Sequence, residues 1–329
     1  MKLKGKQVLV TGAGGFIGSH LVEALVKNQA KVKAFVHYNS RNDWGMLELL
    51  NKRILSEVEI VAGDIRDSEA LRKAVKKCQV VFNLAASVGI PYSFVHPKDV
   101  VETNVSGALN LLLAGKDSRV EKIVHTSTSE VYGTAKYVPM DENHPLSPQS
   151  PYAASKASAD QIVMSFFKSY NLPVGIVRPF NVYGPRQSAW AVIPTIITQA
   201  LVKGEVYLGA TFTTRDLTFV SDTVEGFLRF AESDKTEGEV INIGSGFEVS
   251  IEELVELVGK CLNKNIKLHS QKERKRPGQS EVVRLVSNSN KALKMLNWSP
   301  RVKLLDGLEK TIEWIEKNIQ LYKQEIYNI

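Results

Sequence analysis

The chain is poor in cysteine and has no long apolar run. Cys78 and Cys261 are the two cysteines among 329 residues, and neither belongs to a CxxC or Cys/His cluster. A disulfide framework and a zinc site are therefore not expected, and no other metal is indicated. No apolar run approaches the roughly 18 residues that a membrane span requires. The N-terminal segment also lacks an apolar leader with a cleavage site, so we expect a cytoplasmic protein with no membrane partner.

An excess of one charge sign is present but modest. The formal net charge is +7, and part of it lies in the run KNIKLHSQKERKR, residues 264–276. This run has no interleaved aromatic residues and no recognition motif, so nucleic acid is not an expected partner. A solvated face is the simplest interpretation of the run. A rim that attracts a phosphorylated small molecule is the alternative.

Short runs of β-branched residues alternate with helix-length amphipathic segments through the first half of the chain. This alternation predicts an α/β fold, a doubly wound parallel sheet of the Rossmann type, covered on both faces. Strands are expected at 7–12, 31–37, 58–64, 80–86, 122–129 and 174–180, and helices at 17–27, 68–77, 100–115 and 152–170.

The pattern loosens after residue 179. A loop at 181–194, a helix at about 193–203, a strand at 239–245 and a helical pattern at 304–319 are expected there. We therefore place a dinucleotide-binding domain at 1–182 plus 216–246. A smaller C-terminal α/β lobe at 183–215 plus 247–329 would close over the carboxyl ends of the strands.

The first strand ends in the glycine-rich stretch VLVTGAGGFIGSHL. Glycines at 12, 15 and 18 permit a tight turn and let backbone N–H groups approach a pyrophosphate at the helix N-terminus. The spacing is G-x-x-G-x-x-G, and its place between a strand and a helix predicts dinucleotide binding. The predicted cofactor contacts are Gly12, Gly15, Phe16, Ile17, Gly18, Tyr38, Asn39, Arg41, Asp64, Ile65, Leu84, Ala85, Ala86, Tyr152 and Lys156.

The sequence gives a weak signal for NAD over NADP. Asp64 is a candidate acceptor for the adenine amino group, or a residue of a strand-end turn. The acidic residue that usually binds the ribose 2′-hydroxyl is missing from the end of the second strand, which reads FVHYNSRND. Arg41 in this stretch could bind a 2′-phosphate or be solvent-exposed. NAD is the expected cofactor, with NADP as the alternative.

Tyr152 and Lys156 lie four residues apart at the start of a predicted helix, so they share a face. A phenol is a poor base at neutral pH, but nearby positive charge favours the phenolate. The pair could then remove a hydroxyl proton while hydride leaves the same carbon. Tyr132 and Lys136 have the same spacing, but Gly133 intervenes and the stretch YGTAKYVP indicates a loop. We therefore predict that Tyr152 is catalytic and that Tyr132→Phe is mild.

Seven stretches across nearly the whole chain together resemble the extended short-chain dehydrogenase/reductase superfamily, in the branch that acts on nucleotide sugars. They are TGAGGFIGSHL, GDIRD, TSTSEVYG, SPYAASK, RPFNVYGPRQ, TRDLTFVSD and RPGQSEV. HYNSRNDWG and TSTSEVYGTAKYVP are especially similar to NAD-dependent 4,6-dehydratases of the legionaminic and pseudaminic acid pathways. The resemblance implies an N-acetylhexosamine on UDP or GDP as substrate. It also implies a homodimer that pairs the helices around 104–114 and 152–167.

The resemblance also implies roles for the residues that follow the fifth strand. Thr128 would bind the sugar hydroxyl that is oxidised, and Glu130 would take the proton of the neighbouring carbon. Ser129 is a further catalytic candidate, in a slot that holds an aspartic acid in many 4,6-dehydratases. The simpler interpretation is that residues 126–129 cap a turn and that Glu130 is an exposed loop acid.

Substrate contacts are implied in the same way. Asn181 matches the diphosphate-contacting loop, and Arg215 and Arg276 match phosphate-binding arginines, whose forked guanidinium suits phosphate oxygens. Val192 and Leu208 match positions that line the nucleotide base pocket. Arg186 is a further candidate, with a salt-bridged surface arginine as the alternative. His125 is expected to be a packed strand residue.

The expected activity is 4,6-dehydration of UDP- or GDP-N-acetylglucosamine. The serine at 129 leaves a second dehydratase-like activity open, oxidation at C4 and epimerisation at C5 of a UDP-sugar 5,6-ene. A nucleotide-sugar 4-epimerase or a uronate decarboxylase are rivals on the same scaffold, and Glu130 argues against an epimerase. A binding protein that senses the dinucleotide without turnover is a rival of another class, and the retained Tyr152–Lys156 pair argues against it.

Overall fold

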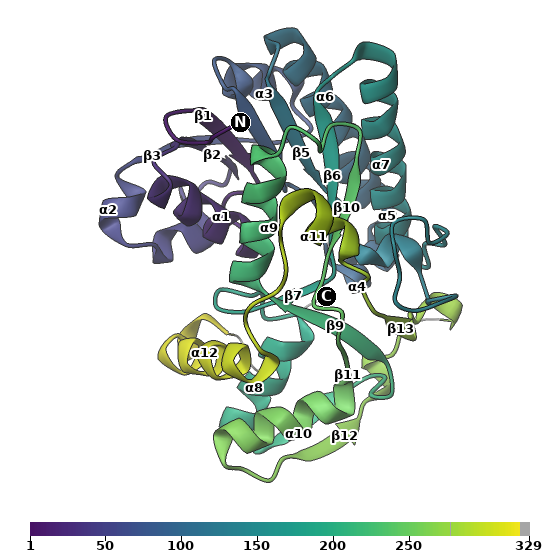
Figure 1. The fold of residues 1–329 in the computed structure, drawn as a ribbon. Helices are drawn as coiled ribbons and strands as arrows, with labels where there is room; N and C mark the ends of the chain where they lie inside the picture. Colours follow the sequence, from purple (N-terminus) through teal and green to yellow (C-terminus); the bar gives the residue numbers. More distant parts are fainter. Residues whose placement is uncertain (277, 323–329) are drawn as a thin grey trace.

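A seven-stranded, wholly parallel sheet forms the centre of the molecule in the computed structural model, which describes residues 1–276 and 278–322 (Figure 1). Its order confirms the predicted α/β parallel fold and is that of a doubly wound dinucleotide-binding sheet. The strands, from one edge to the other, are β10 (Val240–Ile243), β6 (Val174–Pro179), β5 (Lys122–Thr126), β4 (Val80–Asn83), β1 (Gln7–Thr11), β2 (Lys31–His37) and β3 (Val58–Gly63).

Helices cover both faces of this sheet, which is why its central strands β1 and β4 are mostly apolar. Helices α1 (Phe16–Lys27) and α9 (Val220–Glu232) pack against each other on one face. Helices α3 (Ser68–Val75), α6 (Gly107–Ser118) and α7 (Pro151–Tyr170) form the other layer (Figure 1). Successive side chains of β1 divide between the layers, because Val8 and Val10 join the α1/α9 core and Leu9 joins the α3/α6/α7 core.

Most of the expected strands are shorter in the structure than in the sequence pattern, and the strand expected at 239–245 is reduced to β10. β4 ends at Asn83 rather than 86, and β5 ends at Thr126 rather than 129. Residues 84–86 and 127–130 leave the sheet and turn along its carboxyl edge. Apolar and β-branched character continued past the last ladder hydrogen bond, so the pattern alone overestimated the strand length.

The helix expected at 100–115 is interrupted by a π-turn. It consists of α5 (Pro97–Val101), the π-helix η2 (Glu102–Ser106) and α6. Asn104 in the π-turn accepts from the backbone N–H of Ser87 at 2.8 Å and donates to the Ser155 hydroxyl at 2.9 Å. Such turns often occur at functional sites. This one ties the loop after β4 to helix α7.

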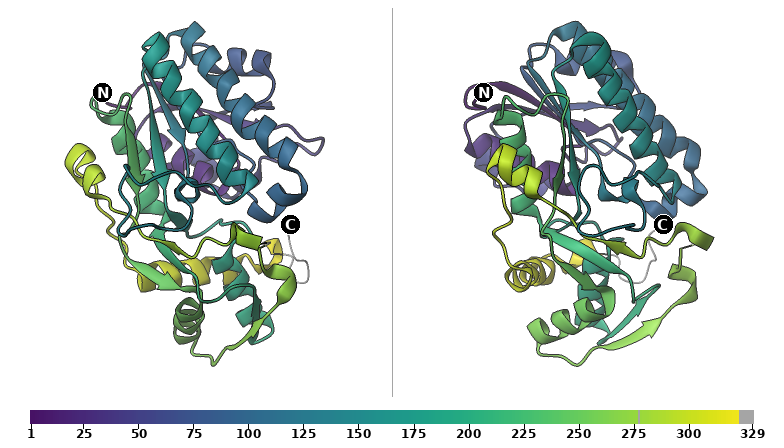
Figure 2. Two further views of the ribbon diagram at one scale, coloured as in Figure 1. Left: turned by 90° about the vertical axis from the view of Figure 1, so that its right-hand side faces the viewer. Right: turned by 45° about the vertical axis from the view of Figure 1, so that its right-hand side comes forward.

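A smaller lobe lies beyond the carboxyl ends of the parallel strands (Figures 1 and 2). Its helices are α8 (Val192–Val202), α10 (Ile251–Leu262) and α12 (Leu304–Lys317), and its strands are β7 (Asn181–Tyr183), β8 (Glu205–Leu208), β9 (Thr214–Phe219), β11 (Glu248–Ser250), β12 (Lys267–Ser270) and β13 (Arg284–Leu285). The expected loop at 181–194 therefore begins with a short strand, because β7 pairs in parallel with β9.

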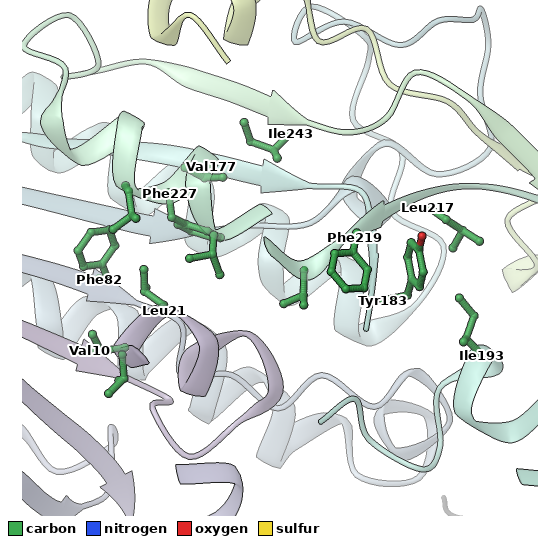
Figure 3. Close-up of a cluster of buried hydrophobic side chains, with 14 of the residues drawn as sticks. Val10, Leu21, Phe82, Val177, Tyr183, Ile193, Leu217, Phe219, Phe227 and Ile243 are labelled. Atoms are coloured by element: carbon green, nitrogen blue, oxygen red, sulfur yellow. The ribbon is translucent and has the colours of Figure 1, made fainter. Parts of the chain in front are cut away.

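The core continues from the sheet into this lobe. Figure 3 shows Val10, Phe82 and Phe227 between the sheet and its helices, and Tyr183, Phe219 and Ile193 in the lobe, within one cluster of buried side chains. Helix α11 (Asn290–Leu296) packs against α9 and β10, so the chain returns from the lobe to the seven-stranded sheet and its helices late in the sequence. The division into two domains at the predicted boundaries stays a prediction.

The remaining helices are short and lie in the connections. They are η1 (Gly45–Leu49), α2 (Lys52–Leu55), α4 (Ile90–Val95), η3 (Ser129–Tyr132), η4 (Lys272–Arg274), η5 (Gly278–Ser280) and η6 (Ile319–Leu321). Within residues 1–276 and 278–322, none of the helices combines the length and the apolar character that crossing a membrane requires.

Candidate active site

A cavity of about 1070 Å³ lies between the carboxyl edge of the sheet and the lobe. The loops after β1, β2, β3, β4, β5 and β6 form one wall, and residues of α8, β8, β9 and the segment before β13 form the other. Parallel strands bring the ends of distant segments to one edge, which is where open α/β sheets bind ligands.

The turn between β1 and α1 forms one end of the cavity. Gly12 has φ +67, and a Cβ added to Gly18 would lie 2.2 Å from the Gly12 carbonyl oxygen, so the turn excludes side chains at both positions. Gly15 is the N-cap of α1, where no side chain caps the helix and no acidic residue stands in the first turn. The first N–H groups of α1 therefore suit an anion.

The end of β2 contributes a compact polar loop to the same wall. The Asn39 side chain accepts from the backbone N–H groups of Arg41 and Asp43, each at 3.1 Å. The Arg41 guanidinium lies 3.6 Å from the Asp43 carboxylate. Asn39, Arg41 and Asp43 all line the cavity. Tyr38 does not, because its side chain points to solvent and is 64% exposed.

Asp64 follows β3 and is bound by a neighbouring arginine. Arg66 donates to its carboxylate from Nη2 at 2.6 Å and from Nε at 3.0 Å, and a further Arg66 N–H group contacts Asp99 at 3.0 Å. The hydrogen bond from Arg66 lowers the pKa of Asp64 below its ordinary value. Both Asp64 and Arg66 line the cavity.

Helix α7 presents Tyr152 and Lys156 to the middle of the cavity. The Ser150 hydroxyl caps the helix by accepting from the Ala153 N–H at 3.1 Å, and Pro151 occupies the first turn. The Lys156 ammonium donates to the Thr126 carbonyl at the end of β5 at 2.6 Å. Tyr152 packs against Ile90 and Val100. Helix spacing and this strand-end contact place both side chains at one point of the wall.

Burial changes the proton affinity of this pair. It lowers the pKa of Lys156 from 10.5 to about 8, against a smaller opposing effect of Asp160. It raises the pKa of Tyr152 above the ordinary value of 10, and a hydrogen bond with Thr128 opposes the rise. A buried phenol of this kind needs added positive charge to act as a base at neutral pH.

The short helix η3 carries the next functional side chains. Thr128 caps it, and its hydroxyl accepts from the Glu130 N–H at 3.3 Å. Thr128 and Glu130 line the cavity, and Glu130 is 6% exposed, so it is not a solvent-exposed loop acid. Ser129 is buried and does not line the cavity. Ser129 is the first residue of η3 and is covered by protein, so the structure does not bring the predicted Ser129 to the cavity.

A buried polar network supports this wall from behind. Asp160 accepts from the Ser127 hydroxyl at 2.7 Å and from Arg178 Nη2 at 2.9 Å. Arg178 donates in turn to the Tyr132 hydroxyl at 3.0 Å, and that hydroxyl donates to Asn242 at 2.8 Å. Tyr132 thus belongs to the core rather than to the cavity. Because Tyr132→Phe would leave buried polar groups without partners, it would destabilise the protein and is not a mild control.

His125 also belongs to this network. Its Nδ1 lies 3.1 Å from the Asn83 side-chain amide, and Asn83 accepts from the Thr11 hydroxyl at 2.7 Å. Burial lowers the pKa of His125 well below its ordinary value, so the imidazole is neutral. This agrees with the expectation of a packed strand residue.

The lobe contributes a charged end to the cavity. Arg215 lies in β9 and Arg276 in the segment before β13, and both line the cavity together with Glu281. Asn181, Val192 and Leu208 also lie in the wall, and the Asn181 Oδ1 atom is buried without a hydrogen-bond partner. An unsatisfied buried acceptor in a cavity wall is suited to a ligand donor.

Arg186 does not reach the cavity. Its guanidinium is buried against α1, where it donates to the Glu23 carboxylate at 2.8 Å and to the His20 ring nitrogen Nε2 at 3.1 Å. The alternative of a salt-bridged arginine therefore describes it better than a substrate contact. Its positive φ of 67 belongs to the turn after β7.

The predicted site residues divide clearly by position. Tyr38, Ser129 and Arg186 lie outside the cavity wall, whereas all the others line it. Sequence reasoning did not single out several further residues of the wall, whose only signal was membership in the quoted stretches GDIRD, RNDWG, GPRQ and RPGQSEV. They include Arg66, Asp43, Gln187 and Glu281.

The residues present fit a dinucleotide. The glycine turn accepts no side chain, the first turn of α1 is free to bind phosphate, and Thr126 Oγ1 is a buried cavity atom without a partner. Asp64 and Ile65 lie beyond the turn, beside Leu84, Ala85 and Ala86. Over the described ranges no group of three His, Cys, Asp or Glu side chains is placed to hold a metal ion.

A glycine turn at the start of α1, a Tyr152–Lys156 pair and two arginines around one cavity define an NAD-dependent enzyme class that modifies nucleotide sugars. Residues 9–311 match the family model described as GDP-mannose 4,6 dehydratase, and the chain belongs to this family.

Named relatives differ in the reaction they catalyse. The dTDP-D-glucose 4,6-dehydratase of Homo sapiens is 33% identical over 328 residues, which cover 97% of this chain and 92% of that protein. The solved dTDP-glucose 4,6-dehydratase of Streptomyces venezuelae, with NAD bound, has a TM-score of 0.84 and 29% identity, covering 96% of this chain and 99% of that one. The UDP-N-acetylglucosamine 4-epimerase of Methanobrevibacter ruminantium M1, in complex with UDP-N-acetylmuramic acid, has a TM-score of 0.85 and 32% identity, covering 96% and 99%.

Removal of the buried ammonium should stabilise the protein while abolishing its activity. Below pH 8 the folded protein carries a charge that burial disfavours, so Lys156→Met is expected to raise the free energy of unfolding at pH 7. A gain on the order of 1–2 kcal/mol is expected after the loss of the hydrogen bond to Thr126. The penalty is complete below the folded-state pKa of about 8 and disappears as the pH rises from there to the ordinary 10.5.

Urea denaturation at pH 7 and at about pH 9.5 measures this effect, and the variant's advantage should shrink at the higher pH. Lys168→Met, an exposed position on the same helix, is the matched control and should change little. If Lys156→Met unfolds more easily than the wild type at pH 7, the ammonium stabilises the fold and the interpretation is wrong.

Proposed function

We propose that this protein is an NAD-dependent 4,6-dehydratase of UDP- or GDP-linked N-acetylglucosamine. The observation that carries the proposal is a carboxylate, Glu130, beside the Thr128–Tyr152–Lys156 group and next to the cationic end of the same cavity. Proton removal from a carbon next to a ketone requires such an acid/base side chain. The motif similarity to the legionaminic and pseudaminic type supports the N-acetylhexosamine.

The cofactor assignment follows from the loop after β2. The Asp43 carboxylate lies in the cavity wall and pairs with Arg41, so it opposes a 2′-phosphate and is available to ribose hydroxyls. No acidic residue for the ribose 2′-hydroxyl was expected at the end of β2, and Asp43 takes this role. Because the same cofactor must be regenerated within each cycle, it should stay bound.

Protein purified without added cofactor is expected to carry NAD(H). Denaturing the protein and separating the released nucleotide by chromatography should give NAD or NADH. Asp43→Asn should lower the retained amount, whereas Asp117→Asn, on the surface beside Arg72, should not. Recovery of mainly NADP would overturn the assignment and make Arg41 a 2′-phosphate ligand.

The first chemical task of the chain is to take the proton of the sugar C4 hydroxyl. When bound, the nicotinamide supplies the hydride acceptor and donor, and its oxidised ring adds positive charge beside Tyr152. Thr128 holds the hydroxyl, Tyr152 takes its proton as phenolate, and the Lys156 ammonium favours that phenolate. The short contact from Lys156 to the Thr126 carbonyl fixes the ammonium in place.

The second task falls to Glu130. A ketone at C4 acidifies the C5 proton, and Glu130 removes it as a carboxylate. Loss of the C6 hydroxyl needs a proton donor, and the buried Ser129 does not line the cavity. Glu130, protonated by the first transfer, can return that proton to the departing hydroxyl as water leaves. The proton that Glu130 removes from C5 is therefore the proton that the departing hydroxyl receives.

Ser129 specifically favours a second candidate. Without an acid at this slot, the substrate could be a UDP-sugar 5,6-ene from which water is already lost. The protein would then oxidise C4, and as the hydride taken from C4 is returned at C6, Glu130 would act as the acid that protonates C5 and sets its configuration. Glu130 has no task in a 4-epimerase, whose chemistry stays at C4, and a uronate decarboxylase would need a carboxylated sugar.

Tyr152→Phe should lose turnover by at least 10²- to 10⁴-fold while NAD(H) retention stays near the wild-type level, because general acid–base catalysis contributes that range. Product formation and the retained nucleotide are measured together. Tyr170→Phe, at the exposed end of the same helix, is the control and should be near normal. Near-normal turnover of Tyr152→Phe would exclude Tyr152 from the mechanism.

Turnover in D₂O tests Glu130 and the substrate together. Mass spectrometry and NMR of products from UDP- and GDP-N-acetylglucosamine should show deuterium at C5 with the wild type. Glu130→Gln should lose this label while still forming reduced nicotinamide, seen by absorbance. Full C5 deuteration by the variant would contradict the role of Glu130. If the wild type ignores both sugars and consumes the 5,6-ene, the second candidate replaces the first.

A further inference from the structure

Four charged side chains alternate in sign across the lobe end of the cavity. Glu130 Oε2 lies 3.5 Å from Arg276 Nη1, Arg276 Nε lies 3.7 Å from Glu281 Oε1, and the same Glu281 oxygen lies 3.5 Å from Arg215 Nη2. The side chains of Glu130 and Arg215 are 8% and 7% exposed. The catalytic base of the proposed function is therefore the first member of a chain that ends in the deeply buried Arg215.

These pairs are looser than the permanent ion pairs of the same protein. Arg178 contacts Asp160 at 2.9 Å, and Arg66 contacts Asp64 at 2.6 Å, both within the range of charge-assisted hydrogen bonds. The contacts of Arg215 and Arg276 with the carboxylates are longer by more than half an ångström. Arg215 Nη1 donates to the Thr214 carbonyl at 2.8 Å, whereas the contacts of both arginines with the carboxylates are long. The N–H groups in these long contacts can therefore turn to another anion.

The charges of the four side chains allow a diphosphate to replace the two carboxylates. Two guanidinium groups and two carboxylates sum to zero, so the cluster is neutral in this wall. A diphosphate brings about two negative charges and offers several oxygens in the geometry that a guanidinium prefers. It cannot share the arginines with both carboxylates without repulsion between like charges.

We propose that Glu130 and Glu281 occupy the place of the substrate diphosphate on Arg276 and Arg215, and that nucleotide binding displaces them. The inference rests on the proposed function and deepens it. When Arg276 turns to the diphosphate, Glu130 is released from its contact with Arg276 and is free to face the sugar. Substrate recognition and release of the base are thus one event.

Glu281 is then a specificity-determining residue with no contact to the reacting carbons. It keeps two mutually repelling arginines close together before the substrate arrives. It also competes with incoming anions, so a diphosphate, which can engage both arginines at once, displaces it more readily than a single phosphate. Its removal should strengthen nucleotide binding, which is opposite to the effect expected of a residue that donates or accepts a bond to the substrate.

Calorimetric titration with UDP, dTDP and GDP tests the inference, because none of these probes carries a sugar that could reach Glu130. The wild type should bind at least one of them. Glu281→Gln should bind the same probe about tenfold more tightly, near the low end of typical coupling between linked groups. Glu130→Gln should bind it several-fold more tightly, although Glu130 serves the sugar. Glu256→Gln, exposed on α10, makes the same charge change outside the cavity and should leave affinity unchanged.

Every outcome of the titrations either supports or overturns the inference. Unchanged or weaker binding by folded Glu281→Gln shows that Glu281 is a direct nucleotide ligand or is uninvolved, and overturns the inference while the proposed function stands. Tighter binding by Glu281→Gln with no change for Glu130→Gln overturns the release of the base. If the wild type binds none of the three probes, the proposed function fails, and the inference fails with it. Should Glu281→Gln not fold, Glu130→Gln alone carries the test.

Discussion

The packing of a parallel sheet between two helical layers governs the rest of this molecule. Strands buried on both faces are largely apolar, and the polar side chains of β1, β4 and β5 lie at or next to the ends of these strands. Because β1, β4 and β5 are adjacent and parallel, their ends meet at one edge. Thr11, Asn83 and Thr126 come together there from segments far apart in the sequence. The cavity is the space that this edge and the lobe enclose.

The ion pairs around that cavity are of two kinds. The pair between Asp160 and Arg178 is buried, tightly bonded and linked to Ser127 and Tyr132, so it supports β5 and α7 as one rigid wall. Breaking such a pair costs several kcal/mol, about 3–5, because an uncompensated charge remains. The pairs of Arg215 and Arg276 are longer and face the cavity. The cavity thus has a tightly bonded support on one side and long ion pairs on the other, and the exchange that we propose concerns the long pairs alone.

Two Y-x-x-x-K pairs show what local context contributes. Tyr152 and Lys156 lie on a long helix whose start is defined by its cap and a proline. This helix could be recognised in the sequence. Tyr132 and Lys136 have no common helix, since η3 ends at Tyr132. The membership of the Tyr132 hydroxyl in the core network could not be recognised in the sequence. That role depends on Arg178 of the neighbouring strand β6 and on Asn242 of the edge strand β10.

The sequence by itself determined the sheet, its covering helices, the glycine turn and the shared helix face of Tyr152 and Lys156, because each depends on residues within a few positions of one another. Helical and strand periodicity, the exclusion of side chains at Gly12 and Gly18, and the i,i+4 spacing are local properties. The tertiary structure decided which side of a turn a residue faces and which charges meet. Motifs predicted Ser129 and Arg186 as site residues, but both are buried outside the cavity wall. Ser129 begins the short helix η3, and Arg186 pairs with Glu23 of α1. Glu281 and Asp43 entered the site through pairings with Arg215 and Arg41, and only folding brings Glu281 and Arg215 together.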